Sequence, residues 1–188
     1  MKVLTKKFFE SANTVLLARR LLGKFLVCRR RGKTSVYIIT EVEAYDGPRD
    51  KASHAHRGKT ARNAPMFGEA GHWYVYFVYG THWMLNIVTG PKDYPAAILI
   101  RGASKFPEIG SLGIPRYPIS GKLISGPGRL TRALHINKKL NNMPATMRGG
   151  LWIEDRGARI PKKLIKRAPR IGISYAQEWA KKPYRFYI

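Results

Sequence analysis

Two predicted β-hairpins set the limits on the architecture of this chain. In the first, residues 24–30 and 35–45 are rich in β-branched and aromatic residues and flank the turn Arg31-Gly32-Lys33-Thr34. In the second, residues 73–79 and 83–89 lie on either side of Gly80-Thr81. Because a hairpin pairs its two strands antiparallel, these segments predict a sheet that is mostly antiparallel.

Shorter segments complete the predicted architecture. Asn13 is a suitable N-cap for an amphipathic helix through residues 15–22, with Gly23 at its end. The Gly- and Pro-rich segment 46–71 predicts a long loop, and a loop of this length in a compact domain usually carries function. The remaining predictions are an apolar strand at 96–100 ending in Arg101, an irregular connection at 105–122, a helix at 129–135, and late strands at 151–154 and 171–174.

The length of the chain limits the number of domains. Its 188 residues can bury most of their apolar surface around one core without disulfides or metal. Neither Gly- and Pro-rich connection has the character of a domain boundary. We therefore expect one α+β domain over residues 1–188, with a curved, mostly antiparallel sheet flanked by helices.

The charge of the chain points to a polyanionic partner. It contains 35 Lys and Arg against 11 Asp and Glu, a net charge of +24, and no carboxylate occurs between residues 109 and 153. Such a surface favours nucleic acid, bound with a steep dependence on salt. An anionic membrane is the competing partner, but no apolar run approaches the roughly 20 residues needed to span a bilayer.

The N-terminus and the single cysteine indicate an internal compartment. The first seven residues lack the apolar stretch and the cleavage site of a signal peptide. Cys28 cannot form an internal disulfide or contribute to a zinc cysteine cluster. We expect the cytoplasm, in association with the nucleoid, or the nucleus.

Two of the few carboxylates lie close together in the first hairpin. A two-residue period from Tyr37 to Tyr45 places Ile39, Glu41, Glu43 and Tyr45 on one face of a strand. A carboxylate and an aromatic ring that point the same way predict a pocket in which the carboxylate acts as a proton acceptor. The ordinary alternative for each glutamate is a solvated or ion-paired side chain.

Aromatic residues crowd the second hairpin. Five rings occur between Trp73 and Tyr79, and packing on both faces of a buried sheet explains most of them. Tyr79 differs, because it lies at the end of its strand next to Gly80. A ring that projects from the tip of a hairpin on a basic protein can stack on bases or insert between them.

Eight short motifs follow one another along most of the chain. They are Glu41-Val42-Glu43-Ala44-Tyr45, Gly47-Pro48-x-Asp50-x-Ala52-x-His54, Arg62-Asn63, Met66-Phe67, Tyr74-Val75-Tyr76-x-x-Tyr79-Gly80, Asn86-Ile87, Ile98-Leu99-Ile100-Arg101 and Ser125-Gly126-Pro127-x-x-Leu130. In this order and spacing the chain resembles the alkyladenine (3-methyladenine) DNA glycosylase family. Some relatives carry a methionine at the position of Thr81.

The resemblance implies a fold like the C-terminal domain of formyltransferases, and a monofunctional enzyme. Such an enzyme flips alkylated or deaminated purines, namely 3-methyladenine, 7-methylguanine and hypoxanthine, out of duplex DNA. An activated water then hydrolyses the N-glycosidic bond and leaves an abasic site. The expected partner is duplex DNA containing damaged purines, bound by a monomer with no membrane contact, no metal and no organic cofactor.

The resemblance also implies roles for individual residues. Glu43 matches the general base that deprotonates the water, and Arg101 matches an arginine near that water and the target phosphate. Tyr79 matches the residue that intercalates into the gap left by the flipped nucleotide. The base pocket is matched by Tyr45, His54, Tyr76 and Asn86, of which Asn86 excludes the exocyclic amino group of guanine.

Three further residues are expected near the DNA backbone. Ser125, Gly126 and Arg129 lie at the start of the predicted helix, where free N–H groups can meet a phosphate. Each single residue also has an ordinary interpretation: a strand-end arginine is usually solvated, and a strand asparagine usually bonds to backbone. A metal site at His54 and His56 is disfavoured, because the spacing identifies no third ligand.

Two other functional classes stay open on the sequence alone. The first is a non-enzymatic RNA- or ribosome-binding basic protein, which the charge permits but which leaves Glu43 without a task. The second is a bifunctional glycosylase/lyase that uses a lysine amine as a Schiff-base nucleophile. No lysine is among the matched residues of these motifs.

Overall fold

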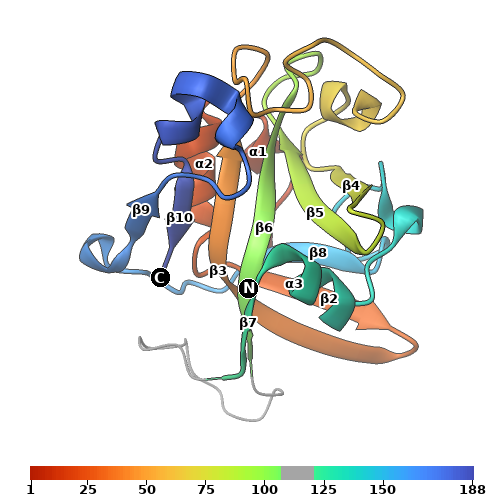
Figure 1. The fold of residues 1–188 in the computed structure, drawn as a ribbon. Helices are drawn as coiled ribbons and strands as arrows, with labels where there is room; N and C mark the ends of the chain where they lie inside the picture. The colour runs from red at the N-terminus through yellow and green to blue at the C-terminus, as the bar shows by residue number, and fades with distance from the viewer. Residues whose placement is uncertain (107–120) are drawn as a thin grey trace.

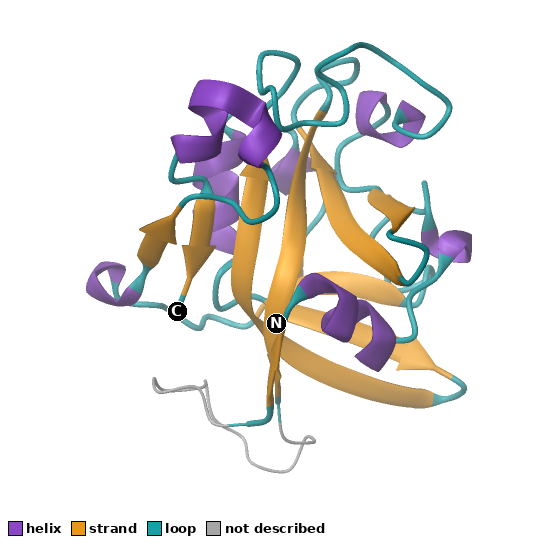
Figure 2. Ribbon diagram, viewed as in Figure 1, coloured by secondary structure: helices purple, strands orange, loops and turns teal. Residues whose placement is uncertain are grey.

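The computed structural model describes residues 1–106 and 121–188 and is built on one curled antiparallel sheet (Figure 1). Its main path runs β1-β8-β2-β3-β6-β5-β4, while β10 and β7 pair with β3 and β6 beside that path. Strands from both ends of the chain join this sheet, as Figure 2 shows. The strands are β1 (Lys2–Val3), β2 (Phe25–Arg30), β3 (Lys33–Tyr45), β4 (Trp73–Val78), β5 (His82–Thr89), β6 (Ala96–Lys105), β7 (Leu123–Ser125), β8 (Leu151–Asp155), β9 (Lys166–Ala168) and β10 (Arg185–Tyr187).

Helix α2 closes the core from behind the sheet in the view of Figure 1. As predicted, Asn13 is its N-cap, and the side-chain oxygen accepts from the N–H of Leu16 at 2.9 Å. Its buried face packs with Ile39 and Val42 of β3 in the main hydrophobic core. The helices and 3₁₀ segments are α1 (Lys6–Phe9), α2 (Thr14–Leu21), η1 (Ala64–Phe67), α3 (Pro127–Ala133), η2 (Lys138–Leu140), η3 (Lys162–Leu164) and η4 (Ser174–Lys181).

The first hairpin is confirmed, but β3 does not keep one alternation along its length. Its pairing with β6 shifts register between Ile39 and Glu41 and again between Glu41 and Val42. This bulge turns the side chains over, so that Ile39 packs in the main core with Val42 and Ala44. The prediction that Ile39 shares a face with Glu43 is therefore wrong, because a strict two-residue period cannot anticipate a bulge.

The second hairpin is also confirmed, and the strand that follows it is longer than expected. Tyr79, at φ 54°, and Gly80, at φ 65°, form the turn between β4 and β5. Strand β6 continues beyond Arg101 to Lys105, since β7 pairs with its last part. Arg101 therefore lies within a strand, beside the bulge of β3, and not at a strand end.

The predicted late strand at residues 171–174 is absent, and β9 and β10 form the C-terminal part of the sheet instead. Gly172, at φ 77°, interrupts the extended backbone, and Ile173 packs in a small cluster with Ala52 and Ala176. The strand at 151–154 is confirmed as β8. Most of the predicted irregular connection at 105–122 lies outside the described residues. Within the described part of the chain, no helix is both long and apolar enough to cross a membrane.

Candidate active site

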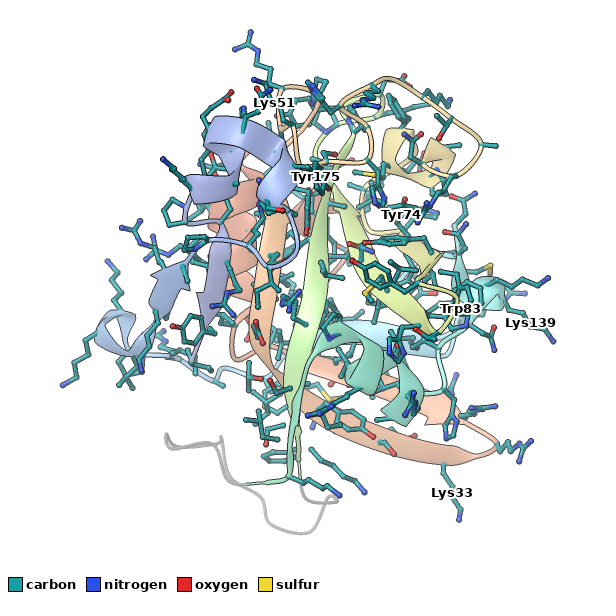
Figure 3. All side chains as sticks on the ribbon, in the orientation of Figure 1. Lys33, Lys51, Tyr74, Trp83, Lys139 and Tyr175 are labelled. Atoms are coloured by element: carbon teal, nitrogen blue, oxygen red, sulfur yellow. The ribbon has the colours of Figure 1, made fainter. Side chains whose placement is uncertain are left out.

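A cavity of about 310 Å³ opens between the β4–β5 hairpin, the loop after β3 and the segment before η4. This volume lies at the lower end of the range typical of small-molecule sites, about 300–1,000 Å³, and suits a flat bicyclic base. Tyr74 and Tyr175 lie on its two sides (Figure 3). The structure brings six of the predicted site residues to its wall: Tyr45, His54, Tyr76, Tyr79, Asn86 and Arg101.

Glu43 lies directly behind the wall of this cavity. Its side chain has no exposed surface, and the three residues that bond to or pair with its carboxylate all line the cavity. The N–H of Ile171 donates to Oε1 at 2.8 Å, and the hydroxyl of Tyr45 donates to Oε2 at 3.0 Å. Arg101 Nη1 lies 3.4 Å from the same Oε2. The carboxylate is thus oriented by three groups that also face the cavity.

Burial and charge act on Glu43 in opposite directions. Loss of solvation by burial raises the pKa of the carboxyl group above its ordinary value of 4.5. Arg101 acts most strongly against this shift, followed by the hydrogen bonds from Ile171 and Tyr45. A carboxylate with a raised pKa is a stronger base than an exposed one.

Three aromatic rings form one side of the cavity. His54 lies against Tyr76 with 4.5 Å between ring centroids, and Tyr74 lies 5.2 Å from Tyr76. Nδ1 of His54 shares a hydrogen bond of 2.8 Å with the Tyr74 hydroxyl. Although His54 keeps exposed surface, packing around its ring, and then the Arg62 charge, lower its pKa. His54 therefore presents a neutral ring near neutral pH.

Asn86 is buried in β5, and its amide is fixed in orientation. Its Nδ2 donates to the carbonyl of Tyr74 at 3.0 Å across the hairpin. The side chain thus bonds to backbone, as a strand asparagine usually does, and it also lines the cavity. The amide cannot rotate away from an incoming base without losing that hydrogen bond.

Tyr79 projects from the turn of the β4–β5 hairpin. It is 84% exposed and lies at the mouth of the cavity. A large aromatic side chain with this exposure has no packing role in the protein itself. A non-glycine residue at positive φ also costs energy, and such positions concentrate at functional sites.

Arg101 connects the two glutamates of β3. Its Nε donates to Glu41 Oε1 at 3.0 Å, while Nη1 approaches Glu43. Glu41 also accepts from Arg185 Nη1 at 3.2 Å, so it is ion-paired on both sides. The ordinary interpretation of Glu41 as a structural, arginine-paired carboxylate is therefore correct.

The residues expected near the DNA backbone lie at the edge of the site. Ser125 pairs with Gly102, the neighbour of Arg101, and Gly126 is the N-cap of α3. Arg129 is exposed on that helix, and Pro127 between them reaches the cavity wall. None of these three residues lines the cavity itself.

Sequence reasoning missed the contribution of the C-terminal segment. Ile171, Ile173 and Tyr175 line the cavity, and the Tyr175 hydroxyl donates to the Ala52 carbonyl at 3.3 Å. These residues lie more than 120 positions after Glu43, and an expected strand obscured their role. The sequence signal that could have found them is the apolar pair Ile171 and Ile173 around Gly172. In the structure Ile171 is half exposed.

A buried ion pair joins this segment to the loop after β3. Nη2 of Arg170 donates to Asp50 Oδ1 at 2.8 Å, and both side chains are fully buried. Arg170 also donates to the Ala44 carbonyl at 2.8 Å and lies 4.8 Å from the ring centroid of Tyr45. Arg170 therefore holds in place the two residues that follow Glu43.

Two properties of the site bear on the alternative chemistries. Among the described residues that line the cavity, none is a lysine. In the same part of the chain, no group of three or more His, Cys, Asp and Glu side chains is arranged to hold a metal ion. His54 bonds to Tyr74, and Nδ1 of His56 bonds to the Pro48 carbonyl instead.

Comparison with known proteins agrees with this geometry. The family described as methylpurine-DNA glycosylase (MPG) matches residues 7–188. A protein of Methanocella arvoryzae named as a 3-methyladenine DNA glycosylase is 43% identical over all of this chain and 92% of its own length. A relative of the same name from Anaeromyxobacter dehalogenans is 43% identical over 95% of this chain and 80% of its own length. Another from Legionella pneumophila is 37% identical, with coverage of 100% and 95%. This chain therefore belongs to the methylpurine-DNA glycosylase family and is a DNA glycosylase.

Proposed function

We propose that this protein, as a monomer, excises 3-methyladenine, 7-methylguanine and hypoxanthine from duplex DNA by hydrolysis. The observation that supports this most directly is a buried carboxylate, Glu43, held against the wall of a ring-lined cavity. Family membership supports DNA as the substrate and 3-methyladenine as a base that is released. The other two bases are our extension.

In the proposed mechanism the damaged nucleotide rotates into the cavity and Tyr79 fills the gap in the duplex. A water reaches Glu43 Oε2 from the cavity, between Tyr45 and Arg101, and this oxygen keeps its hydrogen bond from Tyr45. Glu43 takes the proton of this water as the oxygen bonds to C1′ of the sugar and the C1′–N bond breaks. Arg101 favours the ionised form of Glu43 and attracts the neighbouring phosphate.

The cavity distinguishes bases by their charge and shape. 3-Methyladenine and 7-methylguanine carry positive charge, which makes them good leaving groups and favours stacking on Tyr76 and His54. Hypoxanthine is neutral and requires protonation or hydrogen bonds from the cavity. Asn86, fixed by its bond to Tyr74, disfavours the 2-amino group that guanine and 7-methylguanine share, so 7-methylguanine is released because its positive charge makes it a good leaving group, and guanine is not.

The decisive experiment is the Glu43→Gln variant. We expect it to lose release of hypoxanthine and 3-methyladenine from duplex oligonucleotides while it retains binding, because the amide keeps the size of the side chain but cannot accept the proton. Glu154→Gln is the matched control, since Glu154 is also buried and paired with an arginine, Arg156, but lies outside the cavity. Undiminished release by Glu43→Gln would refute the mechanism.

A lyase mechanism through a lysine amine is the second candidate. It requires a lysine within reach of C1′, and no described residue of the cavity wall supplies one. Borohydride reduction during turnover on a hypoxanthine duplex distinguishes the two, because only the amine mechanism forms a covalent adduct. We expect no adduct.

A further inference from the structure

A second hollow lies beside the tip of the β4–β5 hairpin, where the start of β5 meets α3. It has a volume of about 340 Å³, and four basic side chains line it: Arg30, His82, Arg132 and His135. We call these four residues and the space between them the basic groove. No aspartate or glutamate is among the described residues that line it.

The groove is assembled from segments that are distant in sequence. Arg30 ends β2, in the hairpin whose far end Lys33 marks in Figure 3, and His82 begins β5. Arg132 belongs to α3, and His135 follows that helix at φ 53°. The groove is therefore a product of the tertiary structure.

Helix α3 is locked onto the hairpin, which makes the groove rigid. A Cβ atom at Gly128 would lie 2.7 Å from the ring of His82, so only glycine allows this close approach. The hydroxyl of Thr131 donates to the carbonyl of Trp83 at 2.8 Å. Arg132 and His82 thus belong to elements that are packed tightly against each other, and both line the groove.

The cations of the groove have no internal partner in residues 1–106 and 121–188. Neither Arg30 nor Arg132 takes part in a side-chain hydrogen bond or an ion pair there, and both are exposed. Arg101 and Arg170, in contrast, are paired with carboxylates. Guanidinium groups that converge without a counter-ion suit phosphate oxygens, which they bind in a forked geometry.

The position of the groove relative to Tyr79 determines which phosphates it can meet. At the tip of the hairpin the cavity is lined by Val78 and Tyr79, which come before Gly80, whereas the groove is lined by Thr81 and His82, which come after it. If Tyr79 fills the gap left by the flipped nucleotide, the two strands of the duplex lie on opposite sides of its ring. The strand with the flipped nucleotide lies on the side of the cavity.

We propose that the basic groove binds the phosphate backbone of the undamaged strand, opposite the flipped nucleotide. This proposal rests on the proposed role of Tyr79 as the wedge. Duplex DNA is then held on both sides of the hairpin, while a single strand uses only the cavity side. The groove adds affinity for duplex without reading its sequence.

The test compares duplex with single-stranded DNA. The probe carries a tetrahydrofuran abasic analogue, which has no base to release, so its binding does not depend on Glu43. For the Arg30→Ala/Arg132→Ala variant we expect the slope of log K against log salt to fall by about two for the duplex and to stay unchanged for the same single strand. Equal loss on both substrates, or no loss on the duplex, would overturn the proposal.

A control variant removes the same amount of charge elsewhere. Lys162→Ala/Lys163→Ala changes two exposed cations of η3, at the opposite edge of the molecule in Figure 1. We expect it to leave both slopes unchanged. If it reduces the duplex slope as much as the groove variant does, the effect belongs to net charge and the groove has no special role. If Tyr79 does not act as a wedge, the Tyr79→Ala variant will bind lesion-containing duplex as tightly as the wild type does, and this result is separate from the groove test.

Discussion

Glu43 is the residue in which the surroundings and the chemistry are most closely linked. Its carboxylate is buried, which raises its pKa, and it is oriented by Arg101, Ile171 and Tyr45, which lower the pKa. Only the deprotonated form can act as a base. Each neighbour therefore affects both where the carboxylate lies and the pH range in which it works.

This linkage predicts the pH dependence of base release. Because the pKa of Glu43 is raised above 4.5, the carboxylate takes up its proton at a higher pH than an ordinary glutamate does. We therefore expect the rate of base release, plotted against pH, to fall on the acidic side at a pH above 4.5. Tyr45→Phe removes a donor to the ionised form, so this acidic limb should move to still higher pH. Single-turnover release of 7-methylguanine measures this, since that base needs no further protonation. An unshifted limb in Tyr45→Phe would contradict the assignment.

Tyr79 makes a separate prediction at the scale of one residue. Because its ring is exposed and has no role in packing, Tyr79→Ala should leave the melting temperature unchanged. It should weaken binding to lesion-containing duplex by about 1–3 kcal/mol, the usual value of one stacked ring. Equilibrium titration of lesion and undamaged duplexes tests this. An equal loss on both duplexes would tell against a wedge.

At the scale of elements, the site depends on a contact between two irregular segments. The loop after β3 supplies His54, the segment before η4 supplies Ile171, and the start of η4 supplies Tyr175. Few regular hydrogen bonds join these segments, and the buried pair of Asp50 and Arg170 connects them. This buried ion pair therefore holds the two irregular segments together, as backbone hydrogen bonds hold neighbouring strands together.

Breaking that pair should cost much of the stability. Removal of one partner leaves a buried charge uncompensated, so Asp50→Asn and Arg170→Gln should each lower the free energy of unfolding by about 3–5 kcal/mol in urea titrations. The double variant should cost less than the sum of the two, because neither charge remains. Lys51→Ala, which breaks an exposed pair with Glu178, serves as the control and should have little effect. Additive losses in the double variant would refute the coupling.

At the scale of the whole molecule, the charge of +24 has two opposing consequences. It attracts DNA, and it also destabilises the compact state through repulsion among the cations. The carboxylates that offset it are partly used inside the site, since Glu41, Glu43 and Asp50 pair with buried or half-buried arginines. The outer surface is left with a strong positive excess.

Salt should therefore act on folding and on binding in opposite directions. From about 0.01 M to about 0.15 M sodium chloride the screening length falls from about 30 Å to about 8 Å, and the melting temperature of the free protein should rise. Over the same range its affinity for undamaged duplex should fall steeply. The experiment should use sodium chloride and not a sulfate salt, because sulfate also stabilises proteins by being excluded from their surface. A melting temperature that falls with salt would show that repulsion does not limit the stability.

Local sequence patterns anticipated the elements whose formation depends on neighbouring residues. The turns at Gly32 and Gly80, the Asn13 cap and the crowding of rings in β4 each depend on a few adjacent residues. The exchange of faces at Ile39 depends on how β3 meets β6, and the cavity wall at residues 171–173 depends on a segment far along the chain. Short windows contain no information about such partners.

The sequence by itself thus determined the antiparallel hairpins and the cationic character, because these follow from local periodicity and composition, while base excision was implied by the resemblance of its motifs to a known family. Only the tertiary structure decided that Glu43 lies behind the cavity wall, that Arg170 closes onto Asp50, and that Arg30 and Arg132 line the same groove. Burial, pKa and charge convergence depend on which distant groups approach each other, and that depends on how the curled sheet brings its edges and loops together.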